Sequence, residues 1–239
     1  MIPTSDDSNT NNISLSRIRS FVRREGRMTL AQQRALTEYW ERFGVESGTV
    51  LLDQESLFGR RATWVLEIGF GDGESLATMA ATHPDINYLG IEVHRPGAGH
   101  LLLRAKELQL TNLRVMCADA IEVLEKQLPN NCFDRIQIFF PDPWPKIRHH
   151  KRRFIQPQRV SLLVHKLKPL GQLHLATDCE NYALSMLDIF NATPELVNTI
   201  AGNGFAPRPD WRPMTKFEQR GLRLNHIIRD LLFLRHANC

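Results

Sequence analysis

A turn with glycine at alternate positions constrains this chain more than any other feature. Residues 65–74 read Val-Leu-Glu-Ile-Gly-Phe-Gly-Asp-Gly-Glu, so an apolar run leads into three glycines, and a helical pattern follows from Ser75 to Ala81. Glycine tolerates positive φ and lets a ligand approach the backbone closely. A helix that begins after such a turn offers free N–H groups. The segment therefore predicts a strand, a ligand-binding turn and a helix, with an ordinary glycine turn as the alternative.

The spacing of the glycines separates two kinds of ligand-binding turn. A dinucleotide-binding turn follows Gly-x-Gly-x-x-Gly, and counted from Gly69 its third glycine would fall on Glu74. The chain instead has glutamate at Glu67 and glycine at Gly69, Gly71 and 73. This pattern resembles the first motif of class I S-adenosylmethionine-dependent methyltransferases. Their cofactor lacks a pyrophosphate and carries a positive amine and sulfonium, so an acid at the strand end suits it.

Composition sets broad limits on what the protein is. The 239 residues are 42% apolar, enough for one or two globular domains. No apolar run is long enough to span a membrane, and residues 1–12 lack the apolar core of a signal peptide, so we expect a cytoplasmic protein. The four cysteines lack Cys-x-x-Cys spacing, which predicts free thiols and no zinc site. The net charge of +4 favours an acidic partner only weakly.

The chain divides into three parts. Residues 1–15 are rich in Ser, Asn, Asp and Thr, which predicts a disordered N-terminal tail. Residues 16–60 hold a basic arm, with five arginines between Arg17 and Arg27, and a helix from Thr29 to about Phe43. The arm is either a nucleic-acid contact or a solvated or core-packing segment. Residues 61–239 form the expected methyltransferase domain.

From Trp64 onward, apolar strands alternate with helices. This alternation predicts an α/β, Rossmann-like fold with a mostly parallel sheet, helices on both faces and ligands at the carboxyl ends of the strands. We expect strands at 64–69, 87–93, 113–117, 133–140 and 172–177, helices at about 74–82, 96–108, 120–127, 155–167 and 180–190, and two late strands around 196–206 and 227–235.

Acidic residues follow the first four expected strands: Glu67, Glu92, Asp119 and Asp142. Glu92 lies roughly 20 residues after the glycine turn, the distance at which an acid holds the ribose hydroxyls of an adenosine. Asp119 could accept a hydrogen bond from an adenine amino group. Any one of these acids could be only a helix cap, but four in succession favour a binding site.

The most specific segment is 139–146, which reads Phe-Phe-Pro-Asp-Pro-Trp-Pro-Lys. Two prolines around an acid give a rigid turn that aims Asp142 off the end of the sheet. Amine and base methyltransferases carry an Asn/Asp-Pro-Pro-aromatic turn at this place. A dense basic run follows at 147–153, for which a solvated loop is the alternative. The adjacent His149 and His150 are a poor metal site, so we expect no metal.

Together these segments closely resemble the bacterial tRNA (guanine-N7)-methyltransferases, which modify the guanine of the tRNA variable loop. The likeness extends from Arg17 to Phe233 and includes the arm, segments 66–71, 90–94, 176–178 and 182–183, and the late-loop segments 207–209 and 212–221. Pro145 and Cys179 depart from the family pattern, which has histidine and tryptophan there.

The resemblance implies roles for individual residues. It implies S-adenosylmethionine as cofactor, bound by Glu67, Gly69, Gly71, Glu92, Asp119 and Asp142, with Asp142 also catalytic. It implies substrate contacts by Lys146, Asp178, Thr215, Lys216, Phe217 and Glu218, although Thr215 and Glu218 also have the spacing of a capping box. It further implies 7-methylguanosine at tRNA position 46 as the product, with the basic residues of the arm and of 148–153 on phosphates. A monomer or a homodimer fits equally well.

Two other functions fit parts of the sequence. A methyltransferase for a small molecule or a protein would keep the cofactor site but leave both arginine clusters unexplained. A non-catalytic RNA-binding protein with a vestigial cofactor fold is the second alternative. Salt-sensitive tRNA binding would argue against the first, and saturable S-adenosylmethionine binding together with methyl transfer would argue against the second.

Overall fold

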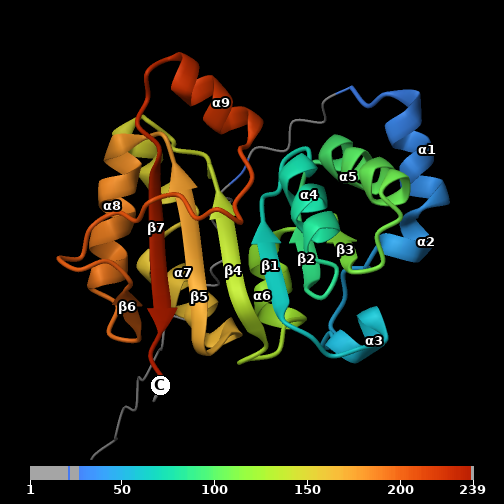
Figure 1. The fold of residues 1–239 in the computed structure, drawn as a ribbon, viewed down its shortest axis with the longest axis horizontal. Coiled ribbons are helices and arrows are strands. Elements are labelled where there is room, and N and C mark those ends of the chain that lie inside the picture. The colour runs from blue at the N-terminus through green and yellow to red at the C-terminus, as the bar shows by residue number, and fades with distance from the viewer. Residues whose placement is uncertain (1–20, 22–26, 238–239) are drawn as a thin grey trace, which may run out of the picture.

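The computed structural model describes residue 21 and residues 27–237, whose centre is a seven-stranded sheet (Figure 1). The strand order is β3-β2-β1-β4-β5-β7-β6, in which β1 to β5 pair in parallel and β7 is antiparallel to both of its neighbours. The strands are β1 (Trp64–Ile68), β2 (Asn87–Ile91), β3 (Leu113–Met116), β4 (Phe133–Phe139), β5 (Leu167–Thr177), β6 (Leu196–Asn198) and β7 (Arg229–Arg235).

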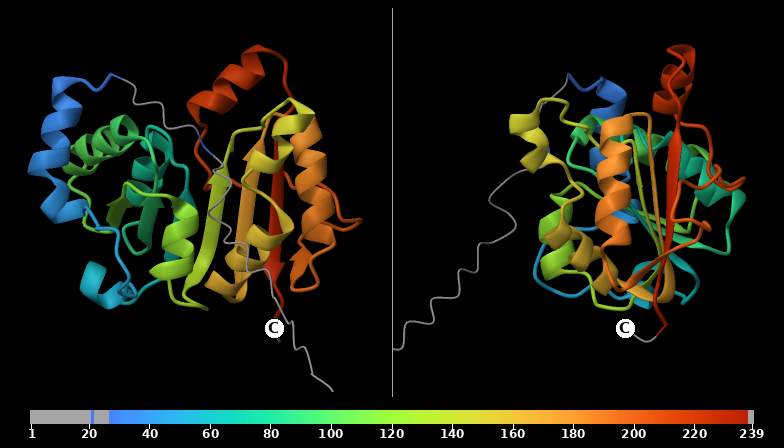
Figure 2. Two further views of the ribbon diagram at one scale, coloured as in Figure 1. Left: turned by 180° about the vertical axis from the view of Figure 1, so that it is seen from behind. Right: turned by 90° about the vertical axis from the view of Figure 1, so that its left-hand side faces the viewer.

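Helices cover both faces of this sheet, as Figure 2 shows from two sides. One apolar cluster joins the sheet to α1, α4 and α5, and the other joins it to α6, α7 and α8. The expected mostly parallel α/β sheet is therefore confirmed. The helices are α1 (Leu30–Glu38), α2 (Trp40–Phe43), α3 (Gln54–Phe58), α4 (Glu74–Thr82), α5 (Arg95–Glu107), α6 (Ala120–Lys126), the 3-10 helix η2 (Ile147–Arg152), α7 (Pro157–Lys166), α8 (Glu180–Asn191) and α9 (Lys216–Arg223).

The N-terminal helices pack directly on the rest of the chain. Ala35 is fully buried against α5, and a Cβ on Gly99 would come within 2.7 Å of the Gln32 carbonyl oxygen, so only glycine permits this close approach. The described part of residues 16–60 thus shares a core with residues 61–237. The expected tail 1–15 and four arginines of the basic arm (Arg17, Arg19, Arg23 and Arg24) lie outside the described residues.

Several local features differ from the expectations. The helix expected from Thr29 to Phe43 is broken at Tyr39, which ends α1 and precedes α2. The strand expected at 196–206 stops at Asn198, because the chain turns at Gly202 and Asn203, whose φ values are 79° and 56°. The short helix α3, which Asp53 caps through the Ser56 N–H, has no counterpart among the expected helices. None of the described helices combines the length and apolarity needed to cross a membrane.

Candidate active site

A cavity of about 610 Å³ opens at the carboxyl ends of the parallel strands. This volume is within the range of small-molecule and cofactor sites, roughly 300–1,000 Å³. Phe21 also lines it, so one described residue of the basic arm reaches this site. The main wall segments are residues 67–72, 91–94, 118–120, 138–142 and 213–217.

The glycine turn forms one wall of the cavity. Gly69, Gly71 and Gly73 have φ values of 74°, 62° and 76°. Residues other than glycine adopt this left-handed backbone region only at a cost in conformational energy. Gly73 is the N-cap residue of α4, so free N–H groups of the first helical turn lie beside the cavity. The predicted strand, glycine turn and helix are therefore all present.

Glu92 ties this turn to the end of β2. Its carboxylate accepts hydrogen bonds from the backbone N–H groups of Gly71 at 2.9 Å, Val93 at 2.7 Å and His94 at 3.0 Å. The side chain lines the cavity and is only 7% exposed. Glu92 thus shapes the cavity wall, a role that the sequence did not reveal, and its contact with a ribose stays a prediction.

Glu67 lies deeper in the cavity wall and is 2% exposed. Burial raises the pKa of its carboxyl to about 7, and the hydrogen bond from Gln137 and the charge of Arg135 oppose this shift only in part. The Gln137 side-chain N–H donates to Glu67 at 2.6 Å, and the Arg135 Nε–H donates to the Gln137 oxygen at 3.1 Å. Glu67 is therefore an acid whose charge changes near neutral pH.

Asp119 is both a helix cap and a cavity residue. Its carboxylate accepts a hydrogen bond from the Ile121 N–H at 3.0 Å and begins α6. The same side chain lines the cavity. The cap is therefore observed, and a contact between Asp119 and an adenine amino group stays a prediction.

Asp142 differs from the other strand-end acids. Its side chain is exposed at the cavity and makes no hydrogen bond or ion pair with another described residue. The residues on either side of the Pro-Asp-Pro turn, Phe140 and Trp144, have φ values of 51° and 43°. Left-handed backbone costs about 1–3 kcal/mol at such residues and clusters at functional sites. Among the described residues Asp142 therefore has no structural partner, and its contact with a ligand stays a prediction.

Contacts around the Pro-Asp-Pro turn keep it in this conformation. The Arg153 Nε–H donates to the Pro143 carbonyl at 2.9 Å, and the Arg152 guanidinium lies 3.9 Å from the centre of the Trp144 ring. We predicted a phosphate contact for Arg153, but this is wrong because its side chain is buried and also bonds Asn181 at 2.7 Å. In the same region Lys146, Arg148 and Lys151 are exposed.

The start of α9 covers the opposite wall of the cavity. Thr215 is the N-cap residue and accepts a hydrogen bond from the Glu218 N–H at 3.1 Å. Lys216 pairs with Asp72 of the glycine turn at 2.5 Å, and the Phe217 ring stacks on Phe140 with centroids 6.4 Å apart. Thr215, Lys216 and Phe217 all line the cavity. Their predicted substrate contacts are compatible with this position and stay predictions.

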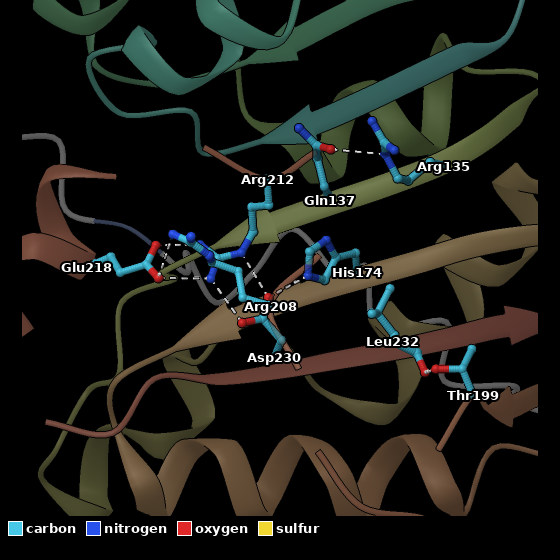
Figure 3. Close-up of polar contacts among 9 residues, drawn as sticks. All are labelled: Arg135, Gln137, His174, Thr199, Arg208, Arg212, Glu218, Asp230 and Leu232. Carbon is cyan, nitrogen blue, oxygen red and sulfur yellow. Dashed lines mark hydrogen bonds and ion pairs between the residues drawn. The ribbon is translucent and has the colours of Figure 1, made fainter. Parts of the chain in front are cut away.

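Glu218 points away from the cavity into a buried cluster with Arg212, Asp230 and His174 (Figure 3). Arg212 donates to both Glu218 oxygens, at 2.6 and 3.1 Å, and to Asp230 at 2.9 Å. His174 bonds Asp230 at 2.6 Å, and burial lowers the pKa of His174 despite that carboxylate. Only half of the expected capping box forms, because the Glu218 carboxylate pairs with Arg212 and not with the Thr215 N–H.

Two further predicted substrate residues do not line the cavity. Lys146 is exposed and precedes η2, and Asp178 bonds the His226 ring nitrogen at 3.0 Å. Their roles, like that of Glu218, stay predictions. The sequence did not indicate that Arg212 is the centre of this buried cluster, because nothing in a polar loop signals that one of its arginines will be fully buried.

Comparison with known proteins adds to this geometry. A family model described as "Putative methyltransferase" matches residues 61–231. The tRNA (guanine-N(7)-)-methyltransferase of Alkalilimnicola ehrlichii is 57% identical over 90% of this chain and 92% of its own length, and that of Aeromonas hydrophila is 52% identical over 97% and 98%. This chain belongs to the tRNA (guanine-N7)-methyltransferase family.

Solved structures show the same fold at much lower sequence identity. The 30S ribosomal A1408 methyltransferase from an uncultured bacterium has a TM-score of 0.54 and 17% identity, covering 77% of this chain and 94% of its own. The antibiotic-resistance methyltransferase Kmr has a TM-score of 0.52 and 14% identity, covering 78% and 93%. The family member described here therefore has the class I methyltransferase fold, as the sequence predicts.

Proposed function

We propose that this chain transfers the methyl group of S-adenosylmethionine to N7 of the variable-loop guanine at tRNA position 46, giving 7-methylguanosine. The observation that carries the proposal is the match over nearly the full length of the chain, at 52–57% identity, to tRNA (guanine-N(7)-)-methyltransferases. The cavity supports it, because Asp142, an exposed acid with no hydrogen-bond partner among the described residues, lines the space where a methyl donor and a base would meet.

The residues around the cavity fit S-adenosylmethionine. A nucleoside can lie beside the glycine turn, where no side chain projects from Gly69 or Gly71, with Glu92 at its ribose and Asp119 at its base. Glu67, at the deep end, would face the positive amine. When bound, this cofactor supplies a methyl carbon attached to a sulfonium.

The protein's task in this reaction is positioning and charge stabilisation. Guanine N7 is a lone-pair acceptor on the major-groove edge of the base, so no group has to remove a proton from it. The cavity walls would align N7 with the methyl carbon and exclude water. The base becomes positive as the bond forms, and the Asp142 carboxylate would stabilise that charge.

The raised pKa of Glu67 predicts how the affinity for the cofactor changes with pH. Since burial raises its pKa to about 7, the carboxyl is largely protonated below pH 7 and must lose its proton to pair with a cation. Cofactor affinity should therefore rise by up to about tenfold per pH unit between pH 5 and 7, and then level off. Calorimetry on the wild type and Glu67→Gln would measure this. Equal pH slopes for the two proteins would contradict the role of Glu67.

Replacing Glu92 is expected to lower the affinity for the cofactor strongly. Charge-assisted hydrogen bonds to ribose hydroxyls are worth about 1.5–3 kcal/mol each, and Glu92 also holds the Gly71 N–H. Glu92→Ala should weaken S-adenosylmethionine binding tenfold or more while tRNA binding is largely kept. Glu122→Ala, an exposed acid on α6, is the control. Unchanged calorimetric affinity in Glu92→Ala would remove this residue from the site.

The proposed function is tested by incubating the protein with labelled S-adenosylmethionine and unmodified tRNA, followed by nucleoside analysis. We expect label in 7-methylguanosine. Label in another nucleoside, or no label at all, would refute the proposal. Methylation of a small molecule or a protein, with no transfer to tRNA, would favour the first alternative function.

A further inference from the structure

The exposed side of α9 carries a stripe of positive charge that the residues discussed so far do not explain. Lys216, Arg220 and Arg223 are all exposed and follow each other at intervals of four and three residues, so they share one helix face. They extend over about 10 Å at 1.5 Å per residue. The acid of this helix, Glu218, is buried on the other side.

Like charges three or four residues apart repel each other on a helix surface, whereas Arg220 and Arg223 lie in the last turn of α9, where cations interact favourably with the helix dipole. Asp72 offsets the charge of Lys216, but within the described part of the chain no ion pair involves Arg220 or Arg223. Within that part, the two arginines therefore have no acidic side chain to pair with, and only the helix dipole uses their charge.

The opposite side of α9 is fixed firmly to the protein. Glu218 is clamped by the fully buried Arg212, and Gly221 lies so close to Asp178 that a Cβ would be 3.3 Å from the carboxylate. A helix that served only as a polar, solvent-exposed surface would not need these buried contacts. They hold the charged stripe in one orientation.

The place of α9 on the molecule points to the kind of partner. Its first turn lines the cavity through Lys216 and Phe217. Figure 2 shows α9 toward the same end of the molecule as η2, which is also basic, and the right-hand view places the two on opposite sides of the sheet. Phosphate contacts position a nucleic acid without reading its sequence. If one base of a nucleic acid enters the cavity, the neighbouring sugar-phosphate backbone would therefore lie next to α9.

We propose that the α9 stripe binds the phosphate backbone of the tRNA, as a second phosphate-binding element in addition to the exposed basic residues Lys146, Arg148 and Lys151. This inference rests on the proposed function, since it requires tRNA as the substrate. Lys216 begins the stripe at the cavity mouth, and Arg220 and Arg223 continue it outward along the helix. The exposed Phe217, beside the stripe, lines the cavity and would therefore face the base.

The test compares tRNA binding by Arg220→Ala/Arg223→Ala with that of the wild type across a series of salt concentrations. The slope of log K against log salt should become less steep by roughly one unit for each phosphate that the variant no longer binds, and the affinity at low salt should fall about tenfold or more. Arg220→Lys/Arg223→Lys should retain most of the slope. The control, Arg61→Ala/Lys126→Ala, removes the same charge from exposed residues before β1 and at the end of α6.

The outcomes separate this inference from the proposed function. If the wild type methylates tRNA but the α9 variant has an unchanged slope, or the control changes as much as the variant, the inference is overturned and the function stands. If the wild type neither binds nor methylates tRNA, both fail. If the α9 variant binds tRNA normally but no longer binds anionic vesicles, the stripe belongs to a membrane surface and the inference is wrong.

Discussion

Replacing Asp142 with alanine is expected to lower kcat for methyl transfer about 10²–10³-fold, the usual effect of removing one preorganised group that stabilises developing charge. Protein stability should change little, because the Asp142 carboxylate makes no hydrogen bond or ion pair with another described residue. Binding of tRNA should also be nearly retained, because the phosphate contacts lie elsewhere. Single-turnover kinetics with saturating cofactor would measure the effect on the chemical step.

Two further variants make this result specific. Asp142→Asn keeps the size and one acceptor but removes the charge, so it should lose most of the rate as well. Glu122→Ala removes an exposed acid on α6 and should leave kcat unchanged. A fall of less than about fivefold in Asp142→Ala, well below the usual effect of such a group, would show that this carboxylate does not stabilise the reacting base.

Replacing Arg212 with alanine is expected to lower the free energy of unfolding by about 3–5 kcal/mol, the cost of breaking a buried pair from one side. The substitution leaves the buried Glu218 and Asp230 without their shared guanidinium. Arg212→Lys should recover only part of the loss, because an ammonium cannot reproduce the planar fork that reaches both carboxylates. Denaturant titration gives these values.

Arg208 provides a matched control for Arg212. Its guanidinium lies 3.7 Å from the same Glu218 but is 42% exposed, so Arg208→Ala should cost only about 0–1 kcal/mol. Equal costs for the two arginines would contradict the account of the cluster.

Local chemistry explains why much of this architecture could be predicted. The alternate glycines at 69, 71 and 73 fit positive φ at each position, and apolar runs of about five residues match strands buried on both faces. The position of Asp142 follows from two prolines that restrict its own turn. These features are encoded within a few neighbouring residues, so the sequence shows them directly.

Other features depend on contacts between residues far apart in the chain. Lys216 meets Asp72 across 144 residues, and Arg153 is buried because it bonds Pro143 and Asn181. In the sequence, Arg153 is indistinguishable from the exposed basic residues before it. Glu218 likewise has the spacing of a capping box, but its carboxylate pairs with the buried Arg212. Tertiary pairing, which local pattern does not specify, decides all three.

The most direct test of the proposed chemistry replaces N7 of the target guanine. A tRNA with 7-deazaguanine at the variable-loop position lacks the attacking lone pair but keeps the Watson–Crick edge and the phosphates. We predict that it binds within a few-fold of normal tRNA and accepts no methyl group, whereas normal tRNA yields 7-methylguanosine on mass spectrometry of the digested nucleosides. Methylation of the deaza nucleoside to the same extent as guanosine would contradict N7 as the acceptor, even with the fold and the cofactor site unchanged.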